Sequence, residues 1–477
     1  MAKRIGAILL LILFVFVIIN VFVLHNTSEV YVFLYIVLCV LGLFMVFASK
    51  KSQSVKKEDF LDFEVGYGKE HKKFVIPTKN FIGELRQNDF TRTASEQELI
   101  AQALENPIGT PKLSAIVTPG KKIVIVTSDI TRPMPTKKVL PAILAEIEAA
   151  GCNLADVTVV FALGSHRKHT EEEKKYLVGE DAYAKVTCVD SDPTQCTHMG
   201  VTSRGTPVDI FSVVAEADYR ICLGNIEYHY FAGYSGGSKA IMPGVSTREA
   251  IQANHSAMVQ AEAKAGNIET NPVRQDIDEV CEKFVPIDFI FNVVLDENKE
   301  IICAVAGHFI QAHREGCKFL DKLYAAEIPE KADIVITTPH GYPKDINLYQ
   351  AQKALDNAKH AVKDGGIIIL VAACTEGLGE GKFEKWIMNS TTEDAMIADI
   401  QDHFELGGHK AAAIALVRKK AQIFCVSELP DDVAGKIFMK PYKDVNTALQ
   451  DALKELGRDA TVYYMPVGGS TLPTLIE

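Results

Sequence analysis

Strand patterns and helix patterns alternate along most of this chain, and that alternation limits its possible folds more than any other feature. Short runs rich in β-branched residues lie at 122–127, 157–162 and 220–223, and a helical pattern covers 136–150 between the first two runs. Parallel strands need a long crossover between them, usually a helix. The alternation therefore predicts an α/β protein with parallel strands.

A second unit of the same kind begins near residue 331. A strand pattern at 332–338 is followed by a helix pattern at 347–362 and by another strand pattern at 367–373. Such a unit implies two parallel strands joined by a right-handed crossover. Because 477 residues suffice for two or three domains, we predict two α/β domains with a cleft between them.

The domain boundaries follow from the positions of these patterns. A linker rich in Lys, Glu and Ser covers 50–62. We predict an N-terminal catalytic domain at 63–328 and a C-terminal, Rossmann-like domain at 329–455. The last segment, 456–477, is predicted to return to the N-terminal domain.

Two apolar runs, 5–24 and 30–48, precede the linker. Each is long enough to cross a bilayer as a helix, at about 1.5 Å per residue and about 30 Å of hydrocarbon. Basic residues flank only the outer ends of the two runs, at positions 3, 4, 50, 51, 56 and 57. A cleaved signal peptide, the competing interpretation, has a shorter apolar run and a small-residue cleavage site. We therefore predict a two-helix transmembrane hairpin at 1–49, with the soluble domains facing the cytoplasm.

Charge and cysteine content exclude several classes of function. The formal net charge is −11, which argues against non-specific nucleic-acid binding. Ten cysteines are scattered along the chain without a C-x-x-C pair. They indicate small buried side chains in a reducing compartment, and neither a disulfide framework nor a zinc site.

The segment 227–244 concentrates residues that carry chemistry, namely His229, Gly236, Gly237 and Lys239. Glycines let a ligand approach the backbone closely, and successive free N–H groups there can hold an anion. A lysine after such a turn can pair with phosphate or act as a nucleophile. The segment fails the P-loop consensus because Ser238 and Ala240 stand where it requires glycine and Ser or Thr. It therefore predicts a cofactor or substrate site other than that of a nucleotide hydrolase.

Two histidines are candidate acid/base residues. His166 follows the strand pattern at 157–162, and His229 follows the one at 220–223. Function in open α/β sheets gathers just beyond the carboxyl ends of the strands, and histidine exchanges protons near neutral pH. Two bases on opposite faces of a stereocentre are what a racemase needs. Taken singly, each histidine could equally be a hydrogen-bonded structural residue.

Other candidates could hold a carboxylate. Arg132 lies in a loop and can clamp a carboxylate through two parallel hydrogen bonds, although a surface pair with Asp129 is the alternative. Gln350 and Lys353 are three residues apart on the predicted helix, so they share a face. Helix faces often carry such residues, and this pair alone is a weak signal.

Four segments, 127–133, 163–170, 227–244 and 347–353, occur in the order found in the nickel-dependent lactate racemase family. The chain resembles that family from about Asp62 to its C-terminus. The resemblance implies a nickel pincer nucleotide, a pyridinium mononucleotide whose sulfur and carbon atoms bind nickel. Proteins that make this cofactor are then implied as partners. The only tryptophan, Trp386, does not align obviously with a tryptophan of the family's C-terminal pocket.

The resemblance also assigns residues to roles. Lys239 resembles the covalent tether of the cofactor and His255 its nickel ligand, with Gly236 and Gly237 beside the cofactor. His166 and His229 resemble the two acid/base residues. The residues that resemble the substrate-binding set are Arg132, Gln350, Lys353 and, in a supporting role, Asp129.

These roles imply racemisation or epimerisation of a lactate-like 2-hydroxy acid by reversible hydride transfer, without nucleic acid. Two alternatives remain. One is a membrane-tethered, non-catalytic protein of the same fold that binds a 2-hydroxy acid or the cofactor. The other is a zinc hydrolase that uses the histidines and Asp129 as ligands.

Overall fold

The computed structural model describes residues 59–476 apart from 297 and 406, together with short stretches between 12 and 40. The chain divides into two compact units, Met1–Phe60 and Leu61–Glu477. The second unit contains every residue to which the sequence assigns a chemical role, and the fold is described for that unit.

The predicted membrane hairpin at 1–49 falls mostly on residues outside those that the structure describes. A span needs about 20 consecutive apolar residues in one helix. Within the described part of the chain, no helix combines that length with that apolar character. The predicted localisation, a two-helix membrane protein with its domains in the cytoplasm, is wrong by this finding, and the membrane is withdrawn as a partner.

The first sheet has six strands in the order β13-β12-β9-β4-β5-β6. All neighbours in it are parallel except β12 and β13. Its strands are β4 (Ile123–Ser128), β5 (Val157–Ala162), β6 (Thr187–Asp190), β9 (Tyr219–Asn225), β12 (Phe289–Leu295) and β13 (Ile301–Gly307). The three strand patterns predicted in this region are therefore confirmed as β4, β5 and β9.

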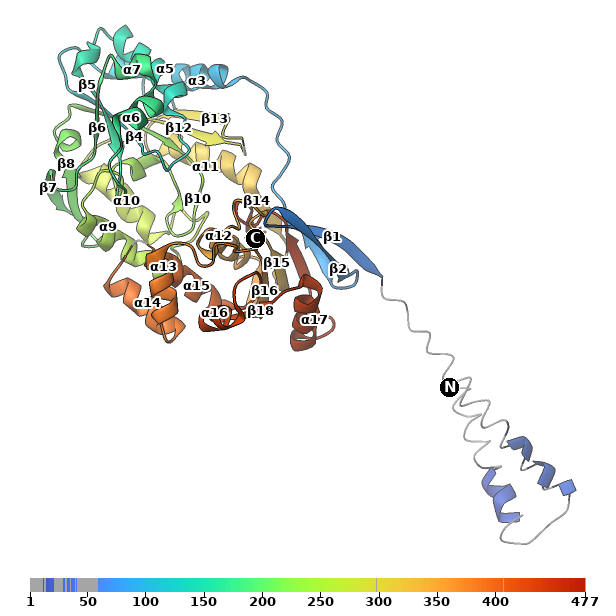
Figure 1. Ribbon diagram of the computed structural model, residues 1–477. Coiled ribbons are helices and arrows are strands. Elements are labelled where there is room, and N and C mark those ends of the chain that lie inside the picture. The colour runs from blue at the N-terminus through green and yellow to red at the C-terminus, as the bar shows by residue number, and fades with distance from the viewer. Residues whose placement is uncertain are drawn as a thin grey trace. The chain divides into compact units, whose positions relative to one another are not determined.

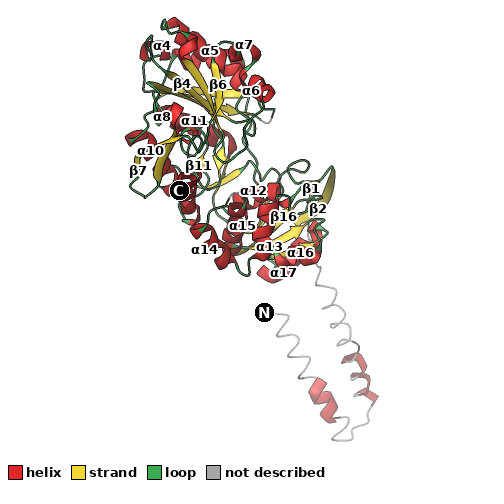
Figure 2. Ribbon diagram, turned by 60° about the vertical axis from the view of Figure 1, so that its left-hand side comes forward, coloured by secondary structure: helices red, strands yellow, loops and turns green. Residues whose placement is uncertain are grey.

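Helices cover both faces of this sheet, because its central strands are apolar on both sides. Ile123 and Ile125 of β4 pack toward α5 (Thr136–Ala149), and Val124 and Val126 pack toward α10 (Pro272–Lys283) and α11 (Gln311–Tyr324). Figure 2 shows β4 and β6 between these helical layers. We call this sheet and its helices the first lobe.

The second sheet also has six strands, in the order β18-β17-β16-β15-β19-β3, and all of them are parallel. Its strands are β3 (Phe81–Glu84), β15 (Ala332–Thr337), β16 (Val362–Val371), β17 (Gln422–Val426), β18 (Met439–Tyr442) and β19 (Val462–Met465). Helices α12 (Leu348–Ala358) and α15 (Gly408–Lys420) pack on one face, and α17 (Val445–Leu456) packs on the other. We call this sheet and its helices the second lobe.

The predicted βαβ unit is confirmed as β15, α12 and β16, although its boundaries differ. The helix ends at Ala358 rather than at 362, and the strand begins at Val362 rather than at 367. Ala332 pairs with Val362 and Ile334 with Ile367, so β16 bulges at 363–366. Gly365 has φ +78° in that bulge, a conformation that costs glycine little. The Asp-Gly-Gly turn signal therefore marks a bulge inside a strand.

The chain crosses between the lobes at both of its ends. The hairpin of β1 (Phe60–Tyr67) and β2 (Glu70–Pro77) packs on the second sheet with α17 (Figure 1). Near the other end, β20 (Leu472–Leu475) pairs in parallel with β14 (Ala325–Ile328). The domain boundaries given from the sequence stay a prediction.

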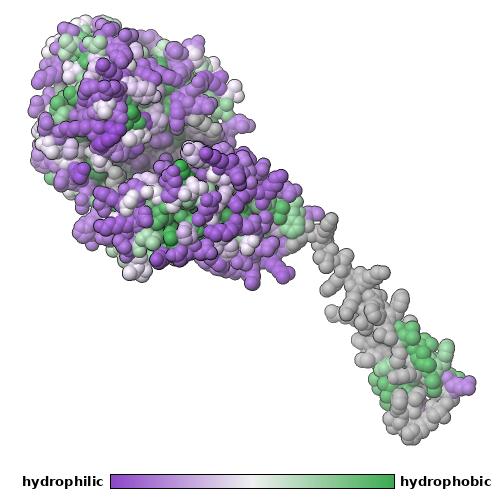
Figure 3. Space-filling model, in the orientation of Figure 1, coloured by the Kyte–Doolittle hydropathy of each residue, from purple (hydrophilic) through white to green (hydrophobic). Residues whose placement is uncertain are grey.

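The remaining elements are short or lie at the edges of the lobes. They are α3 (Glu96–Glu105), α4 (Leu113–Ile116), α6 (Glu171–Val178), α7 (Glu180–Tyr183), β7 (Cys196–Val201), β8 (Pro207–Phe211), α8 (Ser212–Ala215), β10 (Tyr228–His229), β11 (Gly233–Tyr234), α9 (Arg248–His255), α13 (Gly381–Asn389), α14 (Glu393–Asp402) and α16 (Asp431–Lys436). The view in Figure 3 shows a mainly hydrophilic outer surface on both lobes.

Candidate active site

Asp129 and His166 meet beyond the carboxyl ends of β4 and β5, which are neighbouring strands. Asp129 Oδ2 accepts a hydrogen bond from His166 Nδ1, and Oδ1 accepts one from Thr131 Oγ1 at 2.8 Å. Burial raises the pKa of Asp129, but the hydrogen bond and charge of His166 outweigh it, so the pKa lies below its usual value. An ionised Asp129 can only accept, so His166 carries its proton on Nδ1 and holds a lone pair on Nε2.

The exposures of the pair suit a proton-transfer role. Asp129 is only 2% exposed, whereas the His166 side chain is 28% exposed. The carboxylate is therefore protected from solvent while the imidazole remains accessible to a substrate. Gly164, with φ +55°, turns the chain after β5, and its N–H donates to Gly244 O at 2.9 Å. That bond ties the His166 loop to the end of the glycine-rich segment.

His229 has the opposite proton arrangement. It ends β10, and the Ala232 N–H donates to its Nδ1 at 3.2 Å. Because Nδ1 is the acceptor, the neutral ring carries its proton on Nε2. Burial lowers the pKa of His229 well below its usual value, and the positive charges of Lys239 and His255 lower it further. The ring is therefore neutral in the free protein.

Two glycines shape the turn that presents Lys239. Gly236 has φ +77° and Gly237 has φ +59°, and a Cβ on Gly237 would lie 3.0 Å from the ring of His313. The Gly237 N–H donates to Asn292 Oδ1 at 2.8 Å. Only glycine fits this turn without strain, so these contacts fix the direction of the backbone that precedes Lys239.

Lys239 presents an amine without a partner. Among the described residues its Nζ makes no hydrogen bond or ion pair, and it lies 5.9 Å from the centre of the Phe231 ring. Burial lowers the pKa of Lys239 well below its usual value, with further lowering by the charges of Arg274 and Arg132. A lysine of lowered pKa has a larger neutral fraction, which is the nucleophilic form.

His255 is oriented as a ligand would be. It is 8% exposed, and its Nδ1 lies 2.8 Å from Asn254 Oδ1. The amide of Asn254 is fixed in direction because its Nδ2 donates to Asp276 Oδ2 at 2.8 Å and to Val273 O at 3.2 Å. Asn254 Oδ1 is therefore an acceptor, His255 carries its proton on Nδ1, and Nε2 keeps its lone pair. Burial lowers the pKa of His255 well below its usual value.

The ring of Phe231 gathers three of these residues. Its centre lies 4.5 Å from the ring of His229, 4.9 Å from the ring of His255 and 5.9 Å from Lys239 Nζ. The histidines belong to β10 and α9, and the lysine follows the glycine turn. The fold thus brings together residues that the sequence spreads over 27 positions, from His229 to His255.

The second lobe contributes a cationic face. Gln350 and Lys353 are exposed on α12, which begins where Asn347 Oδ1 accepts from the Gln350 N–H at 3.0 Å. Burial lowers the pKa of Lys410 on α15, and the charges of Lys353 in the second lobe and Arg132 in the first lobe lower it further. Within the described residues the Gln350 side chain makes no hydrogen bond to the other candidates.

A hollow of about 450 Å³ adjoins Tyr349, the residue before Gln350. It is bounded by Ser165 beside His166, by Ile251 and Gln252 on α9, and by Tyr349 and Phe404 in the second lobe. The Phe404 ring also lies 5.3 Å from that of His255. The hollow therefore adjoins neighbours of the candidate histidines, and the candidate residues themselves do not line it.

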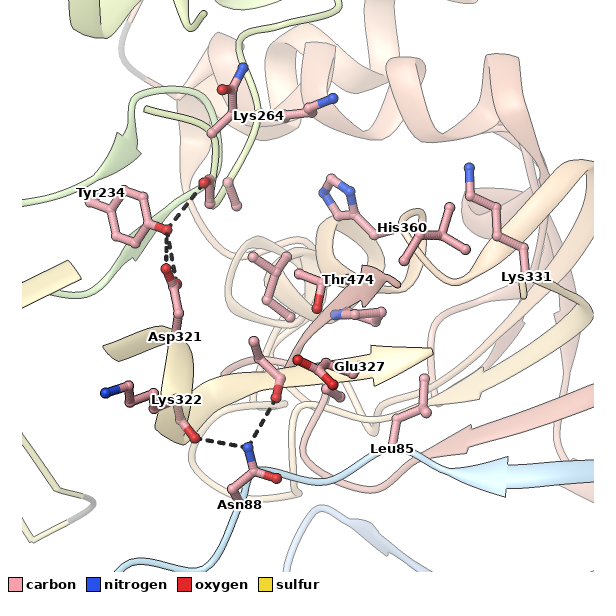
Figure 4. A pocket seen from close by; sticks show the side chains of 18 of the residues that line it. Leu85, Asn88, Tyr234, Lys264, Asp321, Lys322, Glu327, Lys331, His360 and Thr474 are labelled. Carbon is pink, nitrogen blue, oxygen red and sulfur yellow. Dashed lines mark hydrogen bonds between the residues drawn. The ribbon is translucent and has the colours of Figure 1, made fainter. Parts of the chain in front are cut away.

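A larger cavity, of about 1140 Å³, lies elsewhere. It is shown in Figure 4 and contains none of the predicted site residues. Tyr234 lines it and donates to both oxygens of Asp321, at 2.8 and 2.9 Å, and Tyr228 donates to the same carboxylate at 2.8 Å. Asp321 belongs to α11, so these hydrogen bonds hold the segment 227–244 against that helix.

Several supporting residues have no clear signal in the sequence. Arg274 is completely buried and donates to Tyr234 O at 2.6 Å, behind the glycine turn, yet it occupies an ordinary amphipathic helix. Lys410 is also buried, and its position in α15 gives no sign of that burial in the sequence. Asn292 is the exception, because a polar residue inside the apolar strand β12 needs a partner and so indicates a special contact.

Two further observations concern metals and tryptophan. No three His, Cys, Asp or Glu side chains gather closely enough to hold a metal ion, among the residues that the structure describes. Trp386 Nε1 donates to Glu405 Oε2 at 2.7 Å, and a Cβ on Gly408 would lie 2.5 Å from the indole. The indole is thus packed between α13 and α15 of the second lobe.

Comparison with known proteins gives the family. Residues 67–266 match the lactate racemase N-terminal domain, and residues 328–472 match the lactate racemase C-terminal domain. The chain is 34% identical over 428 residues to lactate racemase from Thermoanaerobacterium thermosaccharolyticum, across 86% of this chain and 99% of that protein. It is 33% identical over 410 residues to lactate racemase from Lactiplantibacillus plantarum, across 82% and 95% of the two chains.

A solved structure has the same fold. The lactate racemase apoprotein from Thermoanaerobacterium thermosaccharolyticum matches with a TM-score of 0.77 at 34% identity, covering 87% of this chain and 100% of that one. The two sheets, and the histidines and lysine between them, define a two-lobed α/β protein built like that apoprotein. The chain belongs to the lactate racemase family, as the four sequence motifs predicted.

Proposed function

We propose that this protein is an isomerase that racemises or epimerises a 2-hydroxy acid. The observation that carries the proposal is the pair His166 and His229, whose Nδ1 atoms have opposite partners, the Asp129 carboxylate for His166 and the Ala232 N–H for His229. A reaction that removes a hydroxyl proton on one side of a carbon and supplies one on the other needs such a pair. The curated relatives of this chain are named lactate racemase, which supports the same reaction and makes lactate the first substrate to test.

The substrate carboxylate would lie between the lobes. Arg132 offers a planar guanidinium for two parallel hydrogen bonds, and Lys353 adds a second positive charge from α12. Gln350, one turn before Lys353, would orient the hydroxyl or carboxylate group. Holding the carboxylate from both lobes keeps the α-carbon in register with the histidines.

The residues around Phe231 fit a nickel pincer nucleotide. Lys239 offers an unpaired amine for a covalent tether, and His255 offers a free Nε2 lone pair to nickel. Gly236 and Gly237 keep the backbone bare beside the tether, since a Cβ on Gly236 would lie 2.9 Å from Asn292 Oδ1. When bound, this group would accept the α-hydride of the substrate and return it.

The protein's own residues would move the protons. His166 Nε2 takes the hydroxyl proton, and the ionised Asp129 stabilises the imidazolium that results. His229 returns a proton on the opposite side, for which it must first be protonated. An anionic substrate beside it raises its pKa, because negative charge favours the imidazolium. The Ala232 N–H contact must then open, since a protonated Nδ1 cannot accept it.

The test is intact-mass analysis of the full chain, purified from cells that make the cofactor, with nickel measured on the same sample. We expect one adduct and about one nickel per chain, as one tether and one nickel-binding histidine imply. Lys239→Ala should lose both, whereas Lys264→Ala, at a half-exposed lysine near Glu262, should keep both. An adduct that persists in Lys239→Ala would refute the tether.

Activity is measured on the same samples by chiral chromatography of L-lactate and other 2-hydroxy acids. Loss of racemisation in Lys239→Ala and its persistence in Lys264→Ala would support the proposed reaction. Cofactor binding without turnover of any 2-hydroxy acid would contradict it and favour a non-catalytic binding protein.

A further inference from the structure

Lys410 is a buried cation that the proposed reaction does not use. It lies in α15, is 8% exposed, and donates to Tyr349 O at 2.7 Å. Its Nζ also lies 3.6 Å above the Tyr349 ring. No described carboxylate forms an ion pair or a hydrogen bond with it. Lysines are almost never this buried without an anionic partner, so an unpaired one indicates a place for a ligand.

Two more cations, Lys353 and Arg132, lie near Lys410. Burial lowers the pKa of Lys410 to about 7, and the charges of Lys353 and Arg132 contribute to the shift. The two carboxylates that line the adjacent hollow, those of Glu380 and Glu405, have other partners. Glu380 accepts from the Phe383 N–H at 2.8 Å at the start of α13, and Glu405 pairs with Lys382 at 2.8 Å. When protonated, Arg132, Lys353 and Lys410 carry three positive charges, of which a single bound carboxylate would balance only one.

The adjacent hollow has room for a longer acid. Its volume of about 450 Å³ lies within the range of pockets that enclose whole small-molecule ligands. Tyr349, whose ring and carbonyl hold Lys410, forms part of its wall, and polar Gln252 forms another part. A substituent that extends from the α-carbon of a bound hydroxy acid could reach Lys410 along Tyr349.

We propose that Lys410 selects 2-hydroxy acids that carry a second anionic group, so that the preferred substrate is a dianion such as a 2-hydroxydicarboxylate. The first carboxylate binds Arg132 and Lys353, and the second anionic group pairs with Lys410. This inference rests on the proposed function, since it concerns the substrate of the same site.

The test compares substrates that differ in the second anion. Racemisation of L-malate, L-2-hydroxyglutarate, 3-phospho-D-glycerate and L-lactate is measured with the cofactor-loaded full chain. We expect kcat/KM for at least one dianionic acid to exceed that for lactate by about tenfold or more, because a buried charge pair contributes strongly to binding. The phosphate arm distinguishes a phosphorylated acid from a dicarboxylate.

Variants connect that preference to Lys410. Lys410→Met should raise KM for the preferred dianion by about tenfold or more, through loss of one charge pair, with a smaller change for lactate. Lys410→Arg keeps the charge and should retain most of the preference, which separates lost charge from lost folding. The matched control is Lys419→Met, an exposed lysine at the far end of α15 that pairs with Asp394, which should leave kcat/KM for every substrate unchanged.

A binding measurement separates this inference from the proposed reaction. Calorimetry on the cofactor-free full chain should show tighter binding of the preferred dianion than of lactate, and Lys410→Met should remove the difference. Racemisation of lactate with no preference for any dianion, and no effect of Lys410→Met, would overturn the inference and leave the proposed function standing. Binding that depends on Lys410 without racemisation of any acid would instead refute the function.

Discussion

His166 and His229 are the same residue type, follow strands of the same lobe, and lie in opposite surroundings. His166 is partly exposed and donates Nδ1–H to a buried carboxylate, whereas His229 accepts at Nδ1 from a backbone N–H among positive charges. One ring can therefore take a proton at Nε2 and the other presents one there. The comparison teaches that the partner of Nδ1, rather than the residue type, sets what each histidine can do.

The largest effect should come from removing the carboxylate that distinguishes the two histidines. Asp129→Asn leaves the shape of the side chain but no negative charge to stabilise a protonated His166. We expect kcat for 2-hydroxy acid racemisation to fall about a thousandfold, within the range for loss of a positioned acid/base group. The rate is measured by chiral chromatography on cofactor-loaded protein.

Asp209→Asn is the matched control, because it changes another carboxylate whose Oδ1 lies 2.6 Å from a histidine Nδ1, that of the exposed His198. It should keep kcat within about threefold of the unmodified protein, as surface substitutions usually do. Equal losses in the two variants would mean that Asp129 acts through stability alone, and the comparison of the two histidines would lose its catalytic meaning.

The sequence predicted the fold well where strands are apolar and helix caps are explicit. The strand β5 has the predicted boundaries, and α5 ends one residue before its predicted end, because β5 is a β-branched apolar run and Gly151, at φ +80°, follows the helix. The helix α12 was predicted four residues too long, since nothing local distinguishes a bulge at Gly365 from a turn. Burial and strand pairing decide that point, and both are properties of the folded chain.

The site was predictable only in part. Strand ends and glycines located His166, His229 and Lys239, and the family resemblance suggested their roles, which stay predictions. The protonation of the histidines depends on Asp129, Ala232 and Asn254, whose contacts exist only after folding. Lys410 was missed for the same reason, since a lysine near the start of a helix gives no sign that Tyr349 and Arg132 will lie beside it.

A smaller effect, on the free energy of unfolding, should test the glycine turn that follows His229 in the chain. Gly237→Ala places a Cβ at φ +59° and 3.0 Å from the His313 ring. We expect a loss of about 2–3 kcal/mol in the free energy of unfolding, from backbone strain and a clash with a buried ring. Urea unfolding followed by circular dichroism measures it.

Gly120→Ala provides the matched control for that loss. Gly120 has φ +72°, but a Cβ there would meet nothing within 4 Å. Its cost should be about 1 kcal/mol, from backbone strain alone. If the two variants lose the same free energy, the glycine turn is not held against His313 and the surroundings of His229 are looser than described.

The smallest effect is a difference in protonation between the two rings. Long-range ¹⁵N correlation spectra of the cofactor-free chain at pH 8 should show the proton on Nδ1 of His166 and on Nε2 of His229, with His166→Gln and His229→Gln used for assignment.

As the pH falls below 6.5, His229 should stay neutral, because burial and the facing cations Lys239, His255, Arg132 and Arg274 lower its pKa. The unfolded chain would bind a proton there that the folded chain does not, so His229 makes the protein less stable as the pH falls below about 6.5. His229→Gln should reduce that loss of stability, and the same tautomer on both rings would remove the distinction on which the proposed proton transfers depend.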